Sequence, residues 1–333
     1  MEKKTIYSIL LGILAIMIIL FGSYNFSISA KRFNYENKSI VIKKGENLYK
    51  TLDNLEIKRS FFVKLYIRRN SEKLKKIEEG NYIFQGKYSL KDIIEKLQNS
   101  KESFVSITIP EGFSTNQIKE RLEKNGIISK EDFDKALSQI KDFSYYTPNG
   151  NFDGYFFPDT YYFIKGEEGV SVINKFLRRF LQKFPPEQYE DKKYFYERLK
   201  LASIIEKEAG NKSEMALVAS VFQNRLDKDM RLQSCATVAY LFNFEKDYIY
   251  YKDLEIDSPY NTYKYKGLTP TPISNPGEAS IKASINPEKT EYFYFVLGSD
   301  GKHNFSKTYN EHIAVQNKEK RGNANDGKIR VKR

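Results

Sequence analysis

The most apolar part of the chain is its N-terminal segment. No charged residue occurs over residues 5–30, and residues 6–21 are apolar at all but three positions. Because a helix rises ~1.5 Å per residue, this run can cross a hydrocarbon core of ~30 Å. We therefore predict a transmembrane anchor within residues 1–30, with its N-terminus in the cytoplasm and the bulk of the chain outside the inner membrane. A cleaved signal peptide is the alternative, because residues 28–30 loosely resemble a small-residue cleavage site.

Two stretches after the anchor share one pattern. Residues 39–65 and 105–137 each begin with a β-like alternation of apolar and polar positions that ends at a glycine, Gly45 or Gly112. An amphipathic helical pattern follows each alternation. We therefore predict small modules of one strand and one helix within residues 31–145. Such a module could bind glycan or serve only as packing that holds the remainder of the chain off the membrane.

The pattern changes after Pro148, where turn residues cluster. Six of the eleven residues over 153–163 are aromatic, which favours a packed segment over an exposed loop. A helical pattern over 170–184 comes next, and strand-like and helical patterns continue to the C-terminal region. We expect residues 146–320 to form one mixed α+β domain, so that the chain as a whole is of the α+β class. The basic tail over 321–333 is predicted to be disordered.

Two glutamates lie near the end of a further helical pattern. On a helix with ~100° per residue, Leu201, Ile204 and Ile205 form one apolar stripe. Glu208 follows Leu201 by seven positions and falls on this stripe, whereas Glu206 lies off it, nearer the boundary. The spacing therefore singles out Glu208 as the unusual carboxylate.

A carboxylate on an apolar stripe is costly to keep ionised unless it is paired or reaches solvent. Gly210 is an expected C′ residue, which places Glu208 in the last turn, where the helix dipole also disfavours a negative charge. Both effects favour the protonated form that a general acid requires near neutral pH. The structural alternative is a buried Glu208 that is bonded to a backbone amide or paired with Arg225.

Composition narrows the possible partners. The net charge of +12 suits anionic surroundings such as phospholipid, nucleic acid or an acidic wall polymer. No nucleic-acid-binding motif is recognisable, so we expect no nucleic-acid partner. The single cysteine, Cys235, cannot form an intramolecular disulfide, and His303 and His312 match no zinc spacing. We therefore expect neither a metal site nor a cofactor.

Eight motifs, taken in chain order, resemble a known family. They are FDGYFFPDTYYF, ASIIEKEAG, VASVFQNRL, MRLQ, SPYNTYKYKGL, PISNPGEASIKASINP, YFYFV and HNFSKTYNEH. Together they resemble the endolytic murein transglycosylases, the MltG or YceG-like family, over about residues 1–320. The resemblance implies a single-pass inner-membrane protein with a LysM-like subdomain, which cuts nascent peptidoglycan strands internally. The position that matches the family's catalytic glutamate is Glu208.

The reaction that this resemblance implies is cleavage of the MurNAc-β-1,4-GlcNAc bond without water. Protonated Glu208 would donate to the glycosidic oxygen, and then act as base while the C6 hydroxyl of MurNAc closes a 1,6-anhydro ring. A lysozyme-type hydrolase would instead need a second carboxylate at ~5–5.5 Å or ~6.5–9.5 Å. Glu206 is a poor partner because residues at i and i+2 diverge on a helix, whereas Asp257 and Glu278 remain open. A non-catalytic scaffold that binds peptidoglycan and recruits cell-wall synthases is the alternative from another class.

The resemblance also implies a set of substrate contacts. These are Gln233, Tyr260, Asn261, Thr262, Tyr263, Asn275, Pro276 and the region of His303. For each residue the alternative is a role in shaping its loop, since Asn and Thr form local turn bonds and Pro fixes the backbone. The chain departs from the family at 234–236, where it reads Ser-Cys-Ala and family members commonly carry an acid and a proline after the first residue. Any contribution of that acid to substrate binding is absent here.

Overall fold

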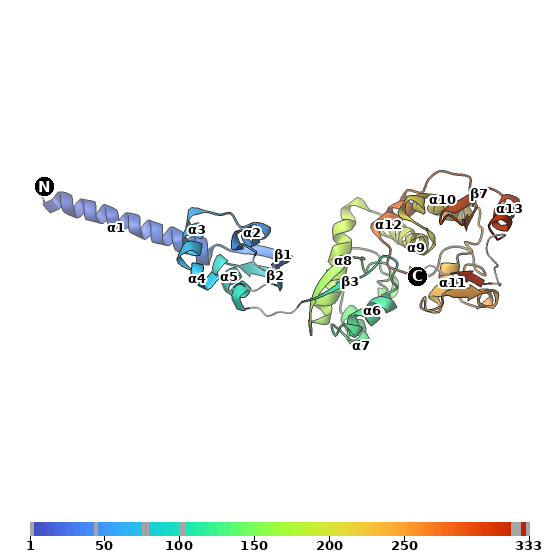
Figure 1. Ribbon diagram of the computed structural model, residues 1–333, viewed down its shortest axis with the longest axis horizontal. Helices are drawn as coiled ribbons and strands as arrows, with labels where there is room; N and C mark the ends of the chain where they lie inside the picture. Colours follow the sequence, from blue (N-terminus) through green and yellow to red (C-terminus); the bar gives the residue numbers. More distant parts are fainter. Residues whose placement is uncertain are drawn as a thin grey trace. The chain divides into compact units, whose positions relative to one another are not determined.

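The computed structural model shows a chain that divides into two compact units. Unit 1 is Met1–Val105 and unit 2 is Ser106–Arg333 (Figure 1). The structure describes residues 3–42, 46–74, 77, 80–99, 104–320 and 328–330. Helices and two-stranded sheets occur in both units, which confirms the mixed α+β class.

Unit 1 begins with an apolar helix, α1 (Lys3–Asn25), which continues into a π-helical turn, η1 (Phe26–Ala30). The segment Tyr7–Ala30 is long and apolar enough to cross a membrane, and it is the only such helix among the described residues. The rest of the unit pairs β1 with β2 and packs four helices around them. Their bounds are β1 Phe33–Ile42, α2 Leu48–Asn54, α3 Phe61–Arg69, α4 Ser71–Leu74, β2 Gly80–Tyr88 and α5 Leu90–Asn99.

The core of unit 1 follows from the predicted alternation. β1 is followed by α2 and α3, so the expected order of strand and then helix over 39–65 is confirmed; Gly45 itself lies outside the described residues. Leu52, Phe84 and Leu90 are fully buried, and they come from α2, β2 and α5. Side chains from three elements therefore make one hydrophobic cluster.

Unit 2 contains the remaining helices and three strand pairs, β3 with β4, β5 with β8 and β6 with β7. β3 crosses the division between the units. The helices are α6 Thr115–Lys124, α7 Lys130–Leu137, α8 Gly169–Lys183, α9 Lys192–Glu208, α10 Met215–Asp227, α11 Cys235–Tyr240, α12 Glu278–Ile285 and α13 Tyr309–Lys320. The strands are β3 Phe104–Thr108, β4 Thr160–Ile164, β5 Tyr248–Tyr250, β6 Tyr294–Leu297, β7 His303–Ser306 and β8 Lys328–Arg330.

The second strand-and-helix stretch, 105–137, belongs almost entirely to unit 2 and not to a separate module. Its strand, β3, pairs with β4. Beyond β3 the backbone N–H of Gly112 donates to the Asn275 carbonyl at 2.9 Å, and that of Asn275 donates to the Phe113 carbonyl at 2.7 Å. These bonds join the stretch to a distant segment of unit 2, and the division between the two compact units lies at 105/106.

The aromatic segment over 153–163 is packed, as predicted. Tyr155, Phe156 and Phe163 are fully buried against rings of α8, including Phe176, whose ring centroid lies 5.9 Å from that of Phe156. The predicted helix over 170–184 is confirmed as α8. This cluster forms one side of unit 2.

The predicted disordered tail needs one correction. Within 321–333, residues Lys328–Arg330 form β8, which pairs antiparallel with β5. The other residues of that stretch lie outside the described part of the chain. Backbone hydrogen bonding to a distant strand, which tail composition does not reveal, orders this short segment.

Candidate active site

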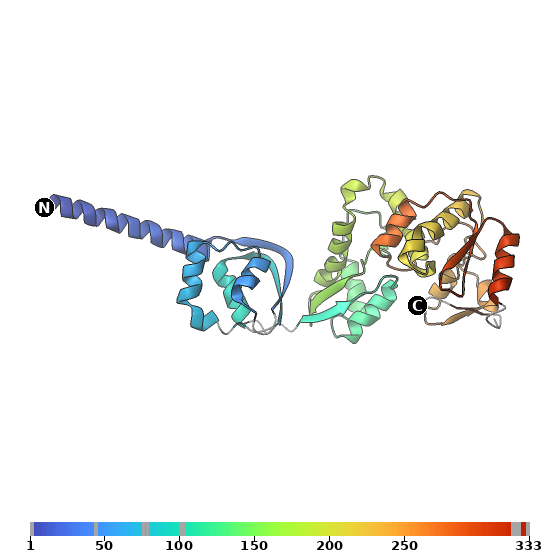
Figure 2. The same cartoon turned by 45° about the horizontal axis from the view of Figure 1, so that its top comes forward.

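The C-terminal half of α9 is enclosed on several sides. It packs against α10, α11 and α12 (Figures 1 and 2), and residues 201–207 are all buried. The predicted apolar stripe of Leu201, Ile204 and Ile205 is confirmed. The expectation that Glu206 lies nearer the boundary is wrong, because its side of the helix is covered by α12 and it is only 6% exposed.

Glu206 has a structural role. Its Oε2 accepts hydrogen bonds from the backbone N–H of Gly277 at 2.9 Å and from the Ser280 hydroxyl at 2.7 Å. Gly277 is the N-cap of α12 and Ser280 lies in its first turn. A carboxylate is favourable there because a helix N-terminus carries unpaired N–H groups and the positive end of the dipole.

Glu208 is the last residue of α9 and is half-buried. Its Oε1 accepts hydrogen bonds from the Ser234 hydroxyl at 2.5 Å and from the backbone N–H of Ala236 at 3.2 Å. Among the described residues it forms no ion pair. One oxygen of Glu208 is therefore held by the start of α11, and its other oxygen, Oε2, makes no hydrogen bond within the described part of the chain.

Arg225 does not pair with Glu208. It is buried, and it donates from Nε to the Phe293 carbonyl at 2.7 Å and from a guanidinium nitrogen to the Leu232 carbonyl at 2.6 Å. Burial lowers the pKa of Arg225 below its ordinary value. Of the two structural alternatives for Glu208, the structure has the backbone-amide bond and lacks the arginine pair.

Gly210 takes the expected C′ position, directly after the C-cap of α9. α9 ends at Glu208 with Ala209 as C-cap, so the placement of Glu208 in the last turn is confirmed. Gly210, however, is not among the glycines with positive φ. A Cβ at this position would lie 3.2 Å from Glu214 Oε2 and 3.5 Å from His303 Cε1. The absence of a side chain therefore lets a carboxylate and an imidazole approach the chain two residues after Glu208.

Glu214 and His303 are hydrogen-bonded to each other. His303 Nδ1 lies 2.8 Å from Glu214 Oε2, and the backbone N–H of His303 donates to Glu214 Oε1 at 3.2 Å. Burial acts to raise the pKa of Glu214, but the hydrogen bonds from His303 outweigh it and hold that pKa below its ordinary value. The sequence indicated His303 and missed Glu214, which lies 89 positions earlier.

Two of the expected substrate contacts, Asn261 and Thr262, are buried. The Asn261 amide donates to the carbonyls of Leu254 and Ile256, both at 2.8 Å, and the residue has no exposed surface. Thr262 Oγ1 accepts from the backbone N–H of Ser234 at 3.0 Å. In this structure neither residue presents a surface to a ligand, and Thr262 instead supports the turn that holds Glu208.

Asn275 and Pro276 are also buried. The Asn275 amide donates to the Phe113 carbonyl at 3.0 Å, and its Oδ1 accepts from the Phe156 backbone N–H at 3.0 Å. The side chain thus joins three distant segments. The role of shaping the loop, rather than substrate contact, fits this geometry.

Three other candidates remain accessible. Gln233 is exposed, and Tyr260 and Tyr263 are half-buried. The Tyr263 hydroxyl lies 2.9 Å from Cys235 Sγ, and that of Tyr260 lies 2.9 Å from Thr271 Oγ1. Gln233 adopts φ +49, a conformation that non-glycine residues rarely hold. Gln233 and Tyr263 border the turn that leads into α11, whereas Tyr260 packs on Tyr240 at the other end of that helix.

Cys235 occupies the position at which the resemblance led us to expect an acid. Burial, reinforced by the charge of Glu208, raises the pKa of Cys235 to about 12 despite its hydrogen bond with Tyr263. The thiol is therefore protonated at neutral pH. This position supplies no second negative charge next to Glu208.

The two acids that the sequence left open as partners are engaged with lysines. The Tyr265 hydroxyl and Lys264 hold the pKa of exposed Asp257 below its ordinary value. Lys183 and Lys282 lower the pKa of Glu278 to about 2. The ion pairs give both carboxylates structural partners, so neither shows the features of a nucleophile or base paired with Glu208.

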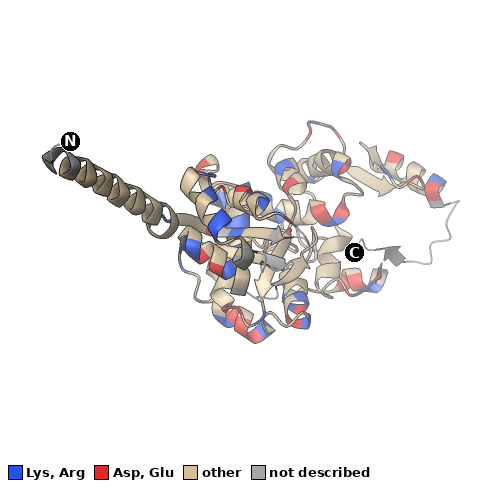
Figure 3. Ribbon diagram, turned by 60° about the vertical axis from the view of Figure 1, so that its left-hand side comes forward, with Lys and Arg blue, Asp and Glu red and all other residues tan. Residues whose placement is uncertain are grey.

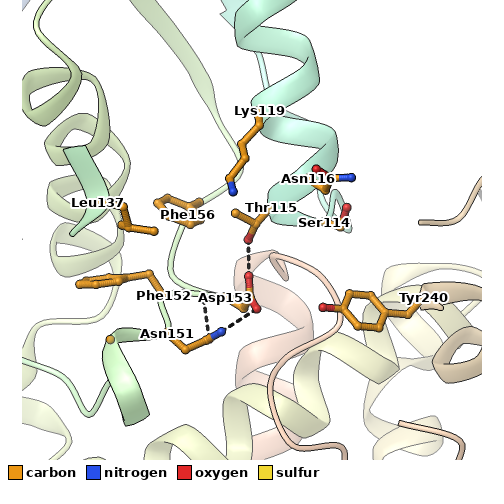
Figure 4. Close-up of a pocket in the computed structure, with 11 residues that line it drawn as sticks. Ser114, Thr115, Asn116, Lys119, Leu137, Asn151, Phe152, Asp153, Phe156 and Tyr240 are labelled. Carbon is orange, nitrogen blue, oxygen red and sulfur yellow. Dashed lines mark hydrogen bonds between the residues drawn. The ribbon is translucent and has the colours of Figure 1, made fainter. Parts of the chain in front are cut away.

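A cavity of about 300 Å³ lies beside the other end of α11 (Figure 4). Asp153 lies at its wall and accepts from the Thr115 hydroxyl at 2.5 Å and from the Asn151 amide at 2.9 Å. Tyr240 also lines it, and its ring packs on that of Tyr260 with centroids 4.9 Å apart. Glu208 is not among the residues that line this cavity.

Comparison with known proteins identifies the family. A family model described as the YceG-like family matches residues 40–318. The chain belongs to the YceG-like family. An endolytic murein transglycosylase of Bacillus subtilis is 36% identical, over 72% of this chain and 72% of its own length. One from Streptococcus pneumoniae is 28% identical, over 82% of this chain and 57% of its own length.

A solved structure supports the same assignment. The crystal structure of a YceG-like protein from Listeria monocytogenes matches with a TM-score of 0.53 and 31% identity. The match covers 84% of this chain and 99% of that one. The YceG-like family and its fold therefore extend over most of the chain.

Proposed function

We propose that this YceG-like protein is an endolytic murein transglycosylase that uses Glu208 as its acid and base. It cleaves the MurNAc-β-1,4-GlcNAc bond of peptidoglycan without water and leaves 1,6-anhydroMurNAc ends. The names of the B. subtilis and S. pneumoniae relatives support the reaction. The observation that carries the assignment of the residue is the asymmetric binding of Glu208, whose Oε1 alone takes both hydrogen bonds.

Because only Oε1 of Glu208 is held by the fold, this one carboxylate can act first as acid and then as base. With Oε1 held by Ser234 and Ala236, Oε2 is the oxygen that carries the proton to the glycosidic oxygen. Once the proton has left, the same two donors stabilise the negative charge that develops on Glu208. The ionised carboxylate then accepts the proton of the C6 hydroxyl as the 1,6-anhydro ring closes and the charge at C1 is neutralised.

The surroundings of Glu208 favour this reaction over hydrolysis. A hydrolase needs a second carboxylate at a defined separation, whereas Glu206 is bound to α12 and both Asp257 and Glu278 are engaged with lysines. Gln233, Tyr260, Tyr263 and the region of His303 are the proposed substrate contacts.

The proposed location follows from α1. We infer that α1 anchors the chain in the cytoplasmic membrane with its N-terminus inside, so that units 1 and 2 meet nascent peptidoglycan outside. The length and hydropathy of Tyr7–Ala30 support a span. Unit 1 would correspond to the LysM-like subdomain, and cell-wall synthases are the proposed protein partners.

The test is mass spectrometry of muropeptides after the full chain, in detergent micelles, has acted on peptidoglycan strands. The parent should release fragments with anhydro ends, and Glu208→Gln should release almost none. Glu255→Gln is the matched control, because Glu255 is exposed and its side chain has no partner within the described residues. It should behave as the parent does.

Other outcomes would favour other functions. Reducing ends in place of anhydro ends would indicate a lysozyme-type hydrolase. Binding to peptidoglycan without new ends in any sample would favour the non-catalytic scaffold. Equal activity of the parent and Glu208→Gln would overturn the assignment of the acid.

A further inference from the structure

Helix α3 of unit 1 has one face in the core and one face exposed. Val63 and Ile67 are 4% and 7% exposed and belong to the hydrophobic core of the unit. On the opposite face Phe61 is 73% exposed and Leu65 is 43% exposed. At ~100° per residue, Phe61 and Leu65 lie within ~40° of each other, so they form one apolar stripe that the described residues of unit 1 leave largely exposed.

The same face is basic. Lys64 and Arg68 flank or continue the stripe, and Arg69 follows. All three are exposed, and none forms an ion pair within the described part of the chain. A short helix that combines large apolar side chains with basic ones on one face is typical of a segment lying at a membrane surface.

The position of α3 next to the apolar N-terminal segment places its exposed face at the membrane. α3 packs on η1, the last turn of the apolar N-terminal segment, and the rings of Phe62 and Tyr24 meet edge to face with centroids 6.2 Å apart. Tyr7–Tyr24 spans ~27 Å at 1.5 Å per residue, so Tyr24 stands near the edge of a hydrocarbon core of ~30 Å. The start of α3 is therefore level with the membrane interface.

The orientation of α3 relative to α1 also suits a position at the membrane surface. Figure 2 shows α3 running across the direction of α1, at the face of unit 1 from which α1 emerges. Figure 3 shows no charged residue along the tan part of α1, and Lys and Arg where it meets the folded part of the unit. With α1 along the membrane normal, α3 lies along the membrane plane.

We infer that α3 is a membrane-surface helix that docks unit 1 on the leaflet from which α1 emerges. Phe61 and Leu65 enter the head-group region, and Lys64, Arg68 and Arg69 contact anionic phospholipid head groups. Continuity with the span of α1 and the charge of the face identify the lipid surface as the occupant. The inference rests on the anchoring role proposed for α1 and is independent of the chemistry at Glu208.

The chain contains no tryptophan, so Phe61→Trp places a single tryptophan on the exposed face. The full chain is reconstituted in liposomes with anionic phosphatidylglycerol, with and without lipids brominated near the head group. Lys50→Trp is the matched control, because Lys50 is exposed on α2, which lies farther from α1 than α3 does in Figure 2. Brominated lipid should quench Trp at position 61 and leave Trp at position 50 nearly unchanged.

A charge variant sharpens the test. Replacing Lys64, Arg68 and Arg69 by Gln in the Phe61→Trp chain should lower the ratio of docked to undocked α3 by about fivefold per residue in anionic liposomes. The same change should have little effect in liposomes of zwitterionic lipid. Circular dichroism of each variant checks that unit 1 remains folded.

Flotation of the same liposomes distinguishes failure of the membrane anchor α1 from failure of docking by α3. Samples that float while Trp at position 61 stays unquenched would leave the anchor standing and overturn docking by α3. Samples that do not float would overturn both the anchor and the docking. A Trp shielded from water but insensitive to brominated lipid would show that a second copy or another protein covers this face, which also overturns the inference.

Discussion

Glu206 and Glu208 lie two residues apart on one helix, and the fold uses them in opposite ways. Glu206 is only 6% exposed and gives Oε2 to the first turn of α12. Glu208 ends α9, is half-buried, and is held by one oxygen from the start of α11. The more deeply buried carboxylate is the structural one. If Glu208 acts as proposed, an oxygen that the fold leaves without a partner marks the reacting group better than depth of burial does.

The comparison predicts its largest effect at Glu208. In Glu208→Gln the side chain cannot transfer a proton, so the rate of anhydro-muropeptide release should fall by about a thousandfold or more. The free energy of unfolding should change little, because an amide oxygen can still accept from Ser234 and Ala236. Release rates by mass spectrometry and urea unfolding of the full chain measure the two quantities. A variant that unfolds readily would show that Glu208 is also structural.

Glu206→Gln should give the reverse result. The amide oxygen can still accept both bonds, but the change removes a buried negative charge that faces the positive end of α12, so the free energy of unfolding should fall by about 2 kcal/mol. The rate per folded molecule should stay within a few fold of the parent, because this carboxylate faces away from the start of α11. If Glu206→Gln kept normal stability but lost turnover, the roles assigned to Glu206 and Glu208 would have to be exchanged.

The use of helical periodicity alone explains why the sequence analysis singled out Glu208 and wrongly placed Glu206 near the boundary of the buried face. Periodicity reports which residues share a stripe, and it correctly grouped Leu201, Ile204 and Ile205. It carries no information on how many sides of a helix are covered. The residues that cover Glu206 lie more than 70 positions later in α12 and its N-cap, so only the folded chain shows that its side is buried.

The predicted substrate contacts show the same limit. Family resemblance marked Asn261 and Asn275 without separating contact from support, and both are fully buried and bonded to backbone carbonyls. Gly210 is the C′ residue of α9, as expected, but the motif did not show that its missing side chain also makes room for Glu214 and His303. Local motifs thus predicted which segments matter, and the long-range contacts decided how each residue is used.

Ser234 provides a smaller test of how Glu208 is held. Ser234→Ala removes the shorter of its two hydrogen bonds, so the release rate should fall about tenfold through loss of positioning. Ser234→Thr keeps the hydroxyl and should restore most of the rate. Ala236→Pro removes the longer bond and should cost less, about a few fold. Equal loss in the Ala and Thr variants would mean that packing, and not the hydroxyl, is responsible.

The smallest expected effect concerns Glu214, which contrasts with Glu208 in having both oxygens bonded to His303. Because the folded-state pKa of Glu214 lies below 4.5, its ionised form stabilises the fold fully above that pH, and this contribution disappears as the pH falls through the folded-state value. Glu214→Gln should therefore lower the free energy of unfolding by about 1 kcal/mol at pH 7. In urea unfolding at a series of pH values, the gap between parent and variant should narrow below pH 4.5. A gap that stays constant to pH 3 would show that shape, and not charge, makes this pair stabilising.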